Sequence, residues 1–404
     1  MSYATLGDFE LSAKTVLLRA DLNVPVKDAQ VTDTTRIERL KSTIEYLVEN
    51  DAKVVILSHF GRPKGEKKSE FSLEFLPHTL EKSWGIDVAF THDCIGETAQ
   101  FAVENLQPGQ VLLLENLRFY PGEEANDVAF ARELAKLGDL FINDAFSAAH
   151  RAHASTEGLA HLLPTAPGFL MEAELSALEK ALENPQKPVM AIVGGAKIST
   201  KLALLNNLVK KVDYLALGGG MANTFMHAKG IEVGKSLCEK DMAAEAKEIM
   251  KTAESFGCDI LLPVDRVVLT TDTFGENAPH EILSADKMPA DREGVDIGPE
   301  TVAMLENILK DCRTVLWNGP MGVFELTPFD EGTNKLAQAV AELTHKNALV
   351  SVAGGGDTVA ALENAGVTHQ FRYISTAGGA FLEWLEGKTL PGVAALTAYQ
   401  QKAA

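Results

Sequence analysis

The chain has 404 residues, of which 46% are hydrophobic and 23% are charged, a balance that excludes disordered, collagen-like and fibrous classes. This length predicts two domains of roughly 200 residues each. The 56 acidic residues outnumber the 37 basic ones, and the net charge of −19 disfavours nonspecific binding to nucleic acid or to an anionic membrane. An anionic ligand would therefore need a local basic pocket.

Short runs of Val, Ile and Leu alternate with amphipathic helical segments, which predicts βαβ units and an α/β fold with parallel sheets. In the first half the predicted strands are Thr15–Ala20, Lys53–Ser58, Gln110–Glu115 and Leu140–Asn143. A helix is predicted over Phe169–Glu183, and Pro185 and Pro188 then mark a domain boundary. In the second half the predicted strands are Pro188–Val193, Tyr214–Leu217, Asp259–Val264, Thr314–Trp317, Ala348–Ala353 and Phe371–Thr376.

Cysteine usage and the N-terminal segment both bear on the compartment. The four cysteines, Cys94, Cys238, Cys258 and Cys312, lie far apart without a C-x-x-C pair, so neither a zinc site nor a disulfide framework is predicted. The N-terminus lacks the apolar region of a signal peptide, and no stretch approaches the ~18 uninterrupted apolar residues of a membrane span. We expect a soluble, cytoplasmic protein.

Loops with basic residues follow the strands of the first half. Ligands of open parallel sheets bind at the carboxyl ends of strands, so these residues should gather on one rim. They are Arg36, His59, Arg62, Arg118 and Arg151. A lone surface arginine is usually just solvated, but four arginines gathered in an acidic protein predict an anion pocket. Asp21 and Asn23 fit either a polar ligand or turn chemistry before Pro25.

Thr35 and Glu38 form a T-x-x-E capping box, which predicts a helix with Arg36 in its first turn. A cation there opposes the helix dipole, and an anion bound at the same N-terminus would offset that cost. His150 and His153 have the spacing H-x-x-H, but no third ligand adjoins them, so no metal is predicted there.

Glycine-rich loops follow the strands of the second half and predict a phosphate cradle. Lys197 and Lys201 are predicted on one face at the start of a helix, where a phosphate would offset their mutual repulsion. Asp357 is expected at a helix N-cap after three glycines, where either capping or a share of a Mg²⁺ site explains it. Glu325 is interpreted either as a ribose ligand or as an exposed loop residue. The spacings of a Walker loop and of G-x-G-x-x-G are absent.

Nine loop motifs in this order and spacing resemble the phosphoglycerate kinase family nearly from end to end. They are RADLNVP, SHFGRP, ENLRFYPGEE, NDAFSAAHRAHAS, GGAKIST, LALGGGMANTF, WNGPMGVFE, GGGDT and STAGGAFLEWLEG. The resemblance implies two Rossmann-like three-layer domains: a phosphoglycerate-binding domain over 1–170, a hinge helix over 171–184 and a nucleotide-binding domain over 185–389. It also implies that the segment 390–404 returns to the first domain and that the protein is a monomer. One departure is Thr200, where many members carry Asp.

The resemblance also implies site residues. The glycerate substrate would be held by Asp21, Leu22, Asn23, Arg36, His59, Phe60, Gly61, Arg62, Arg118 and Arg151. The nucleotide would be held by Lys201, Gly219, Gly220, Asn318, Glu325, Gly354, Gly355, Gly356, Asp357 and Thr358, with Asp357 also approaching Mg²⁺. Arg36, Lys197, Lys201, Gly378 and Gly379 would stabilise the transferred phosphoryl group.

The implied reaction moves a phosphoryl group reversibly from 1,3-bisphosphoglycerate to Mg-ADP, giving 3-phosphoglycerate and ATP. The leaving carboxylate belongs to an acid of pKa about 3 to 4, so no general base is required, and the domains must close to bring the substrates together. Two alternatives share the architecture: a two-domain NAD-dependent dehydrogenase, which needs G-x-G-x-x-G, and a non-catalytic sugar-phosphate binding protein, in which paired lysines would be superfluous.

Overall fold

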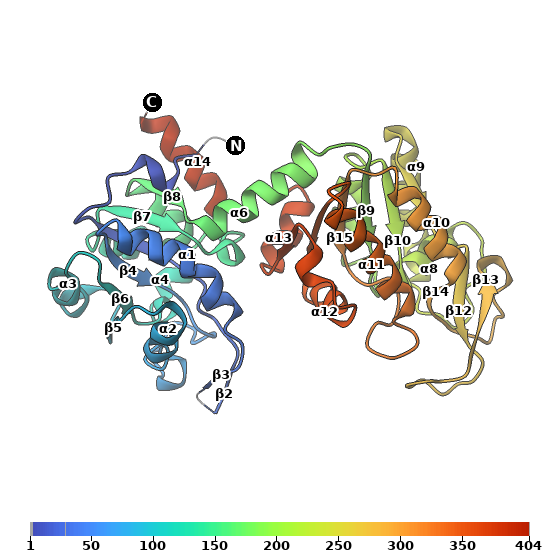
Figure 1. Ribbon diagram of the computed structural model, residues 1–404, viewed down its shortest axis with the longest axis horizontal. Coiled ribbons are helices and arrows are strands. Elements are labelled where there is room, and N and C mark those ends of the chain that lie inside the picture. The colour runs from blue at the N-terminus through green and yellow to red at the C-terminus, as the bar shows by residue number, and fades with distance from the viewer. Residues whose placement is uncertain (1–2, 29, 404) are drawn as a thin grey trace. The chain divides into compact units, whose positions relative to one another are not determined.

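The computed structural model describes residues 3–28 and 30–403. The chain divides into two compact units (Figure 1). The first is made of two segments, the residues up to Leu175 and those from Thr389 onward, and the second spans Ser176–Lys388. Each unit contains a six-stranded parallel sheet, which confirms the predicted α/β class. Among the described helices, none combines the length and hydrophobicity that a membrane span requires.

The sheet of the first unit has the strand order β5-β6-β4-β1-β7-β8, with β1 between β4 and β7. Its strands are β1 Thr15–Arg19, β4 Lys53–Leu57, β5 Val88–Thr91, β6 Val111–Leu114, β7 Leu140–Asn143 and β8 Thr165–Pro167. Four of the six match predicted strands. The other two were missed because β5 alternates between buried and exposed residues and β8 is a three-residue edge strand that ends in a proline.

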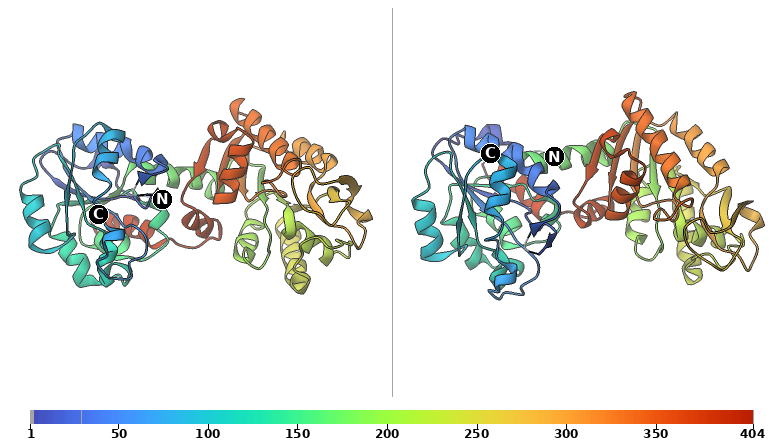
Figure 2. Two further views of the ribbon diagram at one scale, coloured as in Figure 1. Left: turned by 90° about the horizontal axis from the view of Figure 1, so that it is seen from below. Right: turned by 60° about the horizontal axis from the view of Figure 1, so that its bottom comes forward.

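Helices cover both faces of this sheet (Figure 2). Helices α1 Thr35–Glu49 and α2 Pro77–Trp84 pack with Val16 and Leu18 on one face. On the other face Leu17 packs with α3 Gly96–Glu104, α5 Val128–Ala135 and Ala395 of α14 Pro391–Ala403. A short helix, α4 Pro121–Glu124, follows β6. With both faces covered, the loops at the carboxyl edge are left to form a site.

The predicted helix over Phe169–Glu183 forms as α6 Phe169–Leu178, continued by a π-helical turn over Glu179–Glu183. Asp144, which follows β7, fixes its start: Asp144 Oδ1 accepts a hydrogen bond from the Met171 N–H at 2.8 Å, and Oδ2 accepts one from the Thr43 hydroxyl at 2.6 Å. Complete burial raises the pKa of Asp144 to about 6.

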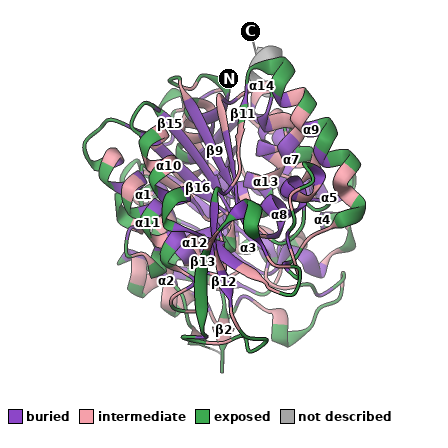
Figure 3. Cartoon of the chain, turned by 90° about the vertical axis from the view of Figure 1, so that its right-hand side faces the viewer, coloured by how far each residue is buried: buried purple, intermediate pink, exposed green. Residues whose placement is uncertain are grey.

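The sheet of the second unit has the order β11-β10-β9-β15-β16-β17, and all its strands are parallel. They are β9 Val189–Val193, β10 Tyr214–Leu217, β11 Asp259–Leu261, β15 Thr314–Asn318, β16 Val350–Gly354 and β17 Tyr373–Ser375. All six overlap predicted strands, and the central β9 and β15 are buried throughout (Figure 3). The predicted strand Asp259–Val264 ends early, before Pro263, which cannot donate to a ladder.

Seven helices accompany this sheet: α7 Leu202–Leu208, α8 Gly219–Ala228, α9 Ala243–Phe256, α10 Pro299–Leu309, α11 Glu331–His345, α12 Gly356–Asn364 and α13 Gly379–Leu385. Residues of α10, α11 and α12 pack around Trp317 on one face. The other helices lie on the opposite face (Figure 2).

Two smaller sheets were not predicted. An antiparallel sheet joins β13 His280–Ser284, β12 Asp265–Leu269 and β14 Gly294–Ile297, and a hairpin joins β2 Val26–Lys27 to β3 Gln30–Val31. The strand β13 is largely exposed (Figure 3), so it lacks the apolar run that identifies a buried strand, and the hairpin strands have two residues each.

Candidate active site

In the first unit the loops after neighbouring strands are tied together at the carboxyl edge of the sheet. The Gly61 N–H donates to Asn23 Oδ1 at 2.9 Å, which links the loops after β4 and β1. Arg118 Nη1 donates to the Gly61 carbonyl at 2.8 Å, which adds the turn after β6. The loops after β1, β4 and β6 are therefore joined at the carboxyl edge of the sheet.

Arg36 lies in the first turn of α1, as predicted, but the predicted capping box of Thr35 and Glu38 does not form. Thr34 precedes the helix, and its hydroxyl donates to Glu38 Oε1 at 2.6 Å, while the Thr35 hydroxyl donates to Asp33 instead. Arg36 Nη1 lies 2.7 Å from Asp21 Oδ2 and donates to the Asn23 carbonyl at 3.0 Å. This partly exposed cation is thus oriented by the loop after β1.

Asp21 holds several groups of this loop. Its carboxylate accepts hydrogen bonds from the Asn23 N–H at 3.1 Å and from the Ser147 hydroxyl. The adjacent Leu22 is buried, and its N–H donates to Ser58 Oγ at 3.0 Å. The Asp21 carboxylate therefore shapes the turn before Pro25, as one of the two interpretations predicts, and it also orients Arg36.

The segment His59–Arg62 is shaped by Asn116, which was not among the predicted site residues. Asn116 Nδ2 donates to the Phe60 carbonyl at 2.8 Å, and Asn116 Oδ1 accepts from the Phe60 N–H at 3.3 Å. Gly61 has a φ of +60°, and a Cβ there would come within 2.4 Å of the Phe71 ring. Glycine is required at this position.

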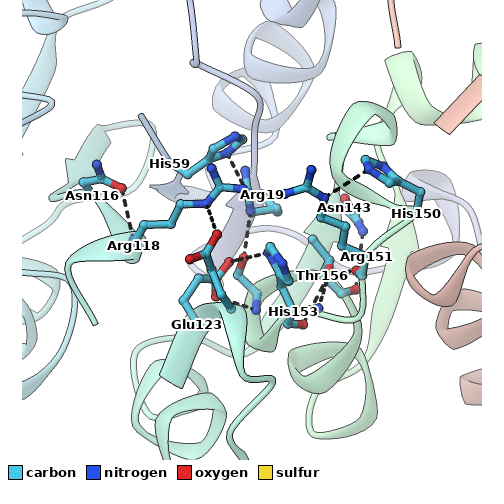
Figure 4. Close-up of polar contacts among 12 residues, drawn as sticks. Arg19, His59, Asn116, Arg118, Glu123, Asn143, His150, Arg151, His153 and Thr156 are labelled. Carbon is cyan, nitrogen blue, oxygen red and sulfur yellow. Dashed lines mark hydrogen bonds and ion pairs between the residues drawn. The ribbon is translucent and has the colours of Figure 1, made fainter. Parts of the chain in front are cut away.

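Arg118 and Arg151 differ in burial. Arg118 is buried and lies 3.4 Å from Glu124 Oε1, whereas Arg151 is exposed and donates from Nε to His150 Nε2 at 3.1 Å. Arg62 is exposed. Figure 4 shows Arg118, His59 and Arg151 around Arg19, a buried residue that was not among the predicted site residues. Its signal was an arginine at the end of the otherwise apolar strand TVLLR.

Two buried histidines of the first unit, His59 and His153, have lowered pKa values. Burial and the charge of Arg19 lower the pKa of His59 well below its usual value. Burial, with Arg118 and Arg19, lowers the pKa of His153 to about 4. A neutral imidazole beside these cations can donate a hydrogen bond to an anion without adding a further positive charge to the site.

The second unit contains a cavity of about 290 Å³. Four predicted nucleotide ligands line it: Gly219, Gly220, Glu325 and Asp357. Its walls also include Gly195, the loop Pro320–Glu325 and the strand β14. The other predicted nucleotide ligands do not line it: Lys201, Asn318, Gly354, Gly355, Gly356 and Thr358. Lys197, Gly378 and Gly379 also lie outside the cavity lining.

Lys197 and Lys201 do not share a helix face, contrary to the prediction, because α7 begins only at Leu202. The loop after β9 turns at Gly195, whose φ is +135°, and folds Lys201 back onto the end of the sheet. There Lys201 Nζ donates to the Gly194 carbonyl at 2.8 Å and to Asn318 Oδ1 at 2.7 Å. Burial lowers the pKa of Lys201 to about 8, partly opposed by Asp357, whereas Lys197 is exposed.

Asp357 is not an N-cap, which corrects the prediction. Gly355, with a φ of +102°, precedes α12, and Asp357 is the exposed second residue of the helix. Thr358 and Asn318 hold the same turn: Thr358 Oγ1 accepts from the Gly319 N–H at 2.7 Å, and Asn318 Nδ2 donates to the Gly354 carbonyl at 2.8 Å. Gly356 is the first residue of α12, and in the same way Gly379 is the first residue of α13, after Gly378.

Two groups in the cavity wall were missed because the antiparallel sheet was not predicted. Arg266 of β12 is buried and donates from Nη1 to Asn223 Oδ1 at 3.1 Å. Asp296 of β14 is buried and accepts the Gly332 N–H at 2.8 Å. Within the described residues, no group of three or more His, Cys, Asp or Glu side chains could hold a metal ion.

Comparisons with known proteins agree on one family. The family model described as "Phosphoglycerate kinase" matches residues 6–388. A phosphoglycerate kinase of Rhodospirillum centenum is 58% identical over 398 residues, covering 98% of this chain and 100% of the relative. One of a Ruegeria species is 59% identical over 396 residues, covering 98% and 100%. The solved structure of phosphoglycerate kinase from Coxiella burnetii superposes with a TM-score of 0.92 at 43% identity, covering 98% of this chain and 99% of the other.

Proposed function

Because this chain belongs to the phosphoglycerate kinase family, we propose that its two units divide the substrates of that enzyme between them. The enzyme transfers a phosphoryl group from 1,3-bisphosphoglycerate to ADP, giving 3-phosphoglycerate and ATP, in glycolysis. The observation that carries the division is chemical. The first unit holds Arg36 against Asp21 and ties Arg118 to the neighbouring loop at Gly61. The second lines its cavity with the glycine turns at Gly195 and Gly219, and Lys201 lies beside Gly195.

The glycerate substrate would bind on the rim of the first unit. It carries a carboxylate or acyl phosphate, a hydroxyl and a phosphate, and the arginines supply forked donors that match those anionic groups. Asp21 and Asn23 are suited to the hydroxyl, and the neutral His59 to a single donated hydrogen bond. The full proposed set is Asp21, Leu22, Asn23, Arg36, His59, Phe60, Gly61, Arg62, Arg118 and Arg151.

The nucleotide would bind in the cavity of the second unit. Gly219 and Gly220 let the backbone approach the base side, and Glu325 is placed to receive ribose hydroxyls. Lys201 and the turns of Asn318, Gly354–Gly356 and Thr358 would surround the phosphates. Lys197, together with the amides of Gly378 and Gly379, would meet the transferred group.

A magnesium ion brought with the nucleotide fits this cavity. Mg²⁺ commonly takes one or two carboxylates and completes its shell with substrate phosphates and water. Asp357 offers one exposed carboxylate on the cavity lining. The ion would supply positive charge beside the phosphates, and we propose Asp357 as its protein ligand.

The residues supply charge and position, and no proton transfer is needed. The leaving carboxylate is stable without a proton at neutral pH. Charge on the moving phosphoryl group would be stabilised by Arg36, Lys197 and Lys201, each of which donates hydrogen bonds and carries no basic lone pair when protonated. We also propose a cytoplasmic location, since all four cysteines are free thiols and Cys94, Cys258 and Cys312 are buried, and we propose that the chain works as a monomer.

Calorimetric titration of two variants with each ligand tests the division of substrates. Arg118→Met should weaken binding of 3-phosphoglycerate at least about tenfold, the loss of one charged hydrogen bond, and leave ADP binding unchanged. Lys201→Met should do the reverse. Arg132→Met, which changes an exposed arginine on α5, is the control. Loss of ADP binding in a folded Arg118→Met protein, with the glycerate still bound, would overturn the assignment.

A further inference from the structure

Behind the rim of the first unit, four buried polar side chains form a chain of hydrogen bonds that ends on His59 (Figure 4). Glu123 Oε1 accepts from the Ser155 hydroxyl at 2.6 Å, and Glu123 Oε2 accepts from the Ser155 N–H at 3.0 Å. Arg19 Nε donates to Ser155 Oγ at 2.8 Å. Arg19 Nη2 lies 3.0 Å from His59 Nδ1.

The direction of the last contact follows from the chemistry of arginine. A guanidinium has five N–H donors and no acceptor, and it stays protonated in proteins. His59 Nδ1 must therefore accept from Arg19 Nη2, so this nitrogen carries no proton. In a neutral imidazole the proton then resides on Nε2.

We propose that Arg19 is a positioning residue that fixes His59 in the neutral tautomer with its proton on Nε2, so that His59 presents a single N–H donor to the glycerate substrate. The donor role rests on the proposed assignment of His59 to the glycerate site. The opposite tautomer would present a lone pair at Nε2 and repel carboxylate or phosphate oxygens. Arg19 thus determines whether His59 Nε2 attracts or repels a substrate oxygen, without contacting the substrate itself.

Arg19 is well built for this role. Its guanidinium is fully buried and held on three sides: by Ser155, by the carbonyl of Ala20 and by His59. The fully buried Glu123 balances its charge through Ser155, which offsets the large cost of burying a cation. A side chain fixed in this way cannot turn to accommodate the other tautomer.

The surroundings of His59 oppose its protonation as well. The charged or titratable groups that act on it are Arg19 from β1, Arg118 from the turn after β6, Arg36 from α1 and His153. A second proton at Nδ1 would also place two donors face to face along the 3.0 Å contact with Arg19. We therefore expect His59 to remain a neutral donor throughout the working pH range.

The tautomer can be read directly by long-range ¹H–¹⁵N correlation on the full chain with ¹⁵N-labelled histidine. The wild type should show one neutral tautomer of His59, protonated at Nε2, and 3-phosphoglycerate should shift that resonance. Arg19→Met removes the donor, so His59 should exchange between tautomers and titrate closer to its ordinary pKa. The KM for 3-phosphoglycerate should rise about tenfold while kcat falls less, since one hydrogen bond of binding is lost.

Three further variants keep the test decisive. Arg132→Met, on the exposed face of α5, should leave the tautomer and the KM unchanged. The double variant Arg19→Met/Glu123→Gln removes both buried charges, so it replaces the single variant in the test if that one unfolds. It should likewise show His59 exchanging between tautomers. Arg19→Lys keeps one donor and should restore much of the wild-type spectrum.

Each failure has its own signature. A wild-type His59 that is protonated at Nδ1, or an unchanged tautomer in folded Arg19→Met, would overturn the positioning role. The predicted tautomer together with no response of His59 to 3-phosphoglycerate would instead overturn its place in the glycerate site, and with it the donor role.

Discussion

Replacing Arg36 with alanine removes a guanidinium that α1 and the loop after β1 hold in place. Its Nη1 is fixed 2.7 Å from Asp21 Oδ2 and 3.0 Å from the Asn23 carbonyl, so the cation is oriented before the substrate binds. Loss of one such preorganised donor to a developing charge typically costs about 3 kcal/mol in the barrier, or about a hundredfold in rate. The Arg36 side chain is 36% exposed, so its ion pair contributes at most about 1 kcal/mol to stability.

The Arg36→Ala protein should therefore fold normally, and its kcat should be about a hundredfold lower than that of the wild type. Initial rates of ATP formation from 1,3-bisphosphoglycerate and ADP, with thermal unfolding as the check on folding, measure both effects. Arg36→Lys keeps a charge but not the forked geometry and should fall between the two, and Arg132→Ala should match the wild type. A folded Arg36→Ala protein with kcat within about threefold of the wild type would refute the role of Arg36 in the transfer.

Four other outcomes follow from the structure. Because burial lowers the pKa of Lys201 to about 8, calorimetric ADP affinity should fall as the pH rises through about 8, and this dependence should vanish in Lys201→Met; an unchanged pH profile in the variant would remove Lys201 from the site. Asp144 has a pKa of about 6 when folded and about 3.9 when unfolded, so the native state holds a proton that the unfolded chain has released between these values. Raising the pH from 4 to 6 should therefore lower the wild-type free energy of unfolding relative to Asp144→Asn by about 2 kcal/mol in urea titrations, and parallel curves would contradict this. Trp317→Ala, in a core position that is 1% exposed, should lose about 3 to 5 kcal/mol of unfolding free energy by the same method, whereas a loss below about 1 kcal/mol would mean that the core refills. Reaction requires the two substrates to meet, so small-angle scattering should show a smaller radius of gyration with both bound than with neither, and an unchanged radius would argue against closure.

The parallel sheets could be predicted because their buried strands are continuous apolar runs, and Leu140–Asn143 and Tyr214–Leu217 form as predicted. The joining of the loops after β1, β4 and β6 could also be predicted, because parallel strands end at one edge. The placement of side chains within the loops could not be predicted from the sequence pattern. The spacing of Lys197 and Lys201 predicts one helix face, whereas the Gly195 turn delays the start of α7 until Leu202.

Contacts between distant segments set the other limit. Arg19 donates a hydrogen bond to Ser155, which lies 136 residues further along the sequence, and no local sequence pattern predicts this contact. Arg266 and Asp296 were missed for a related reason, since charged residues interrupt the apolar runs of their strands, DRVVL and GVDI.

Amide chemical-shift mapping with each ligand alone tests the central claim most directly, namely that the glycerate substrate and the nucleotide bind to different units. We predict that 3-phosphoglycerate shifts the amides of Asn23, Gly61 and Arg118, and that ADP shifts those of Gly195, Gly219 and Asp357. Shifts from 3-phosphoglycerate that fall only around the glycine turns of the second unit would contradict the account.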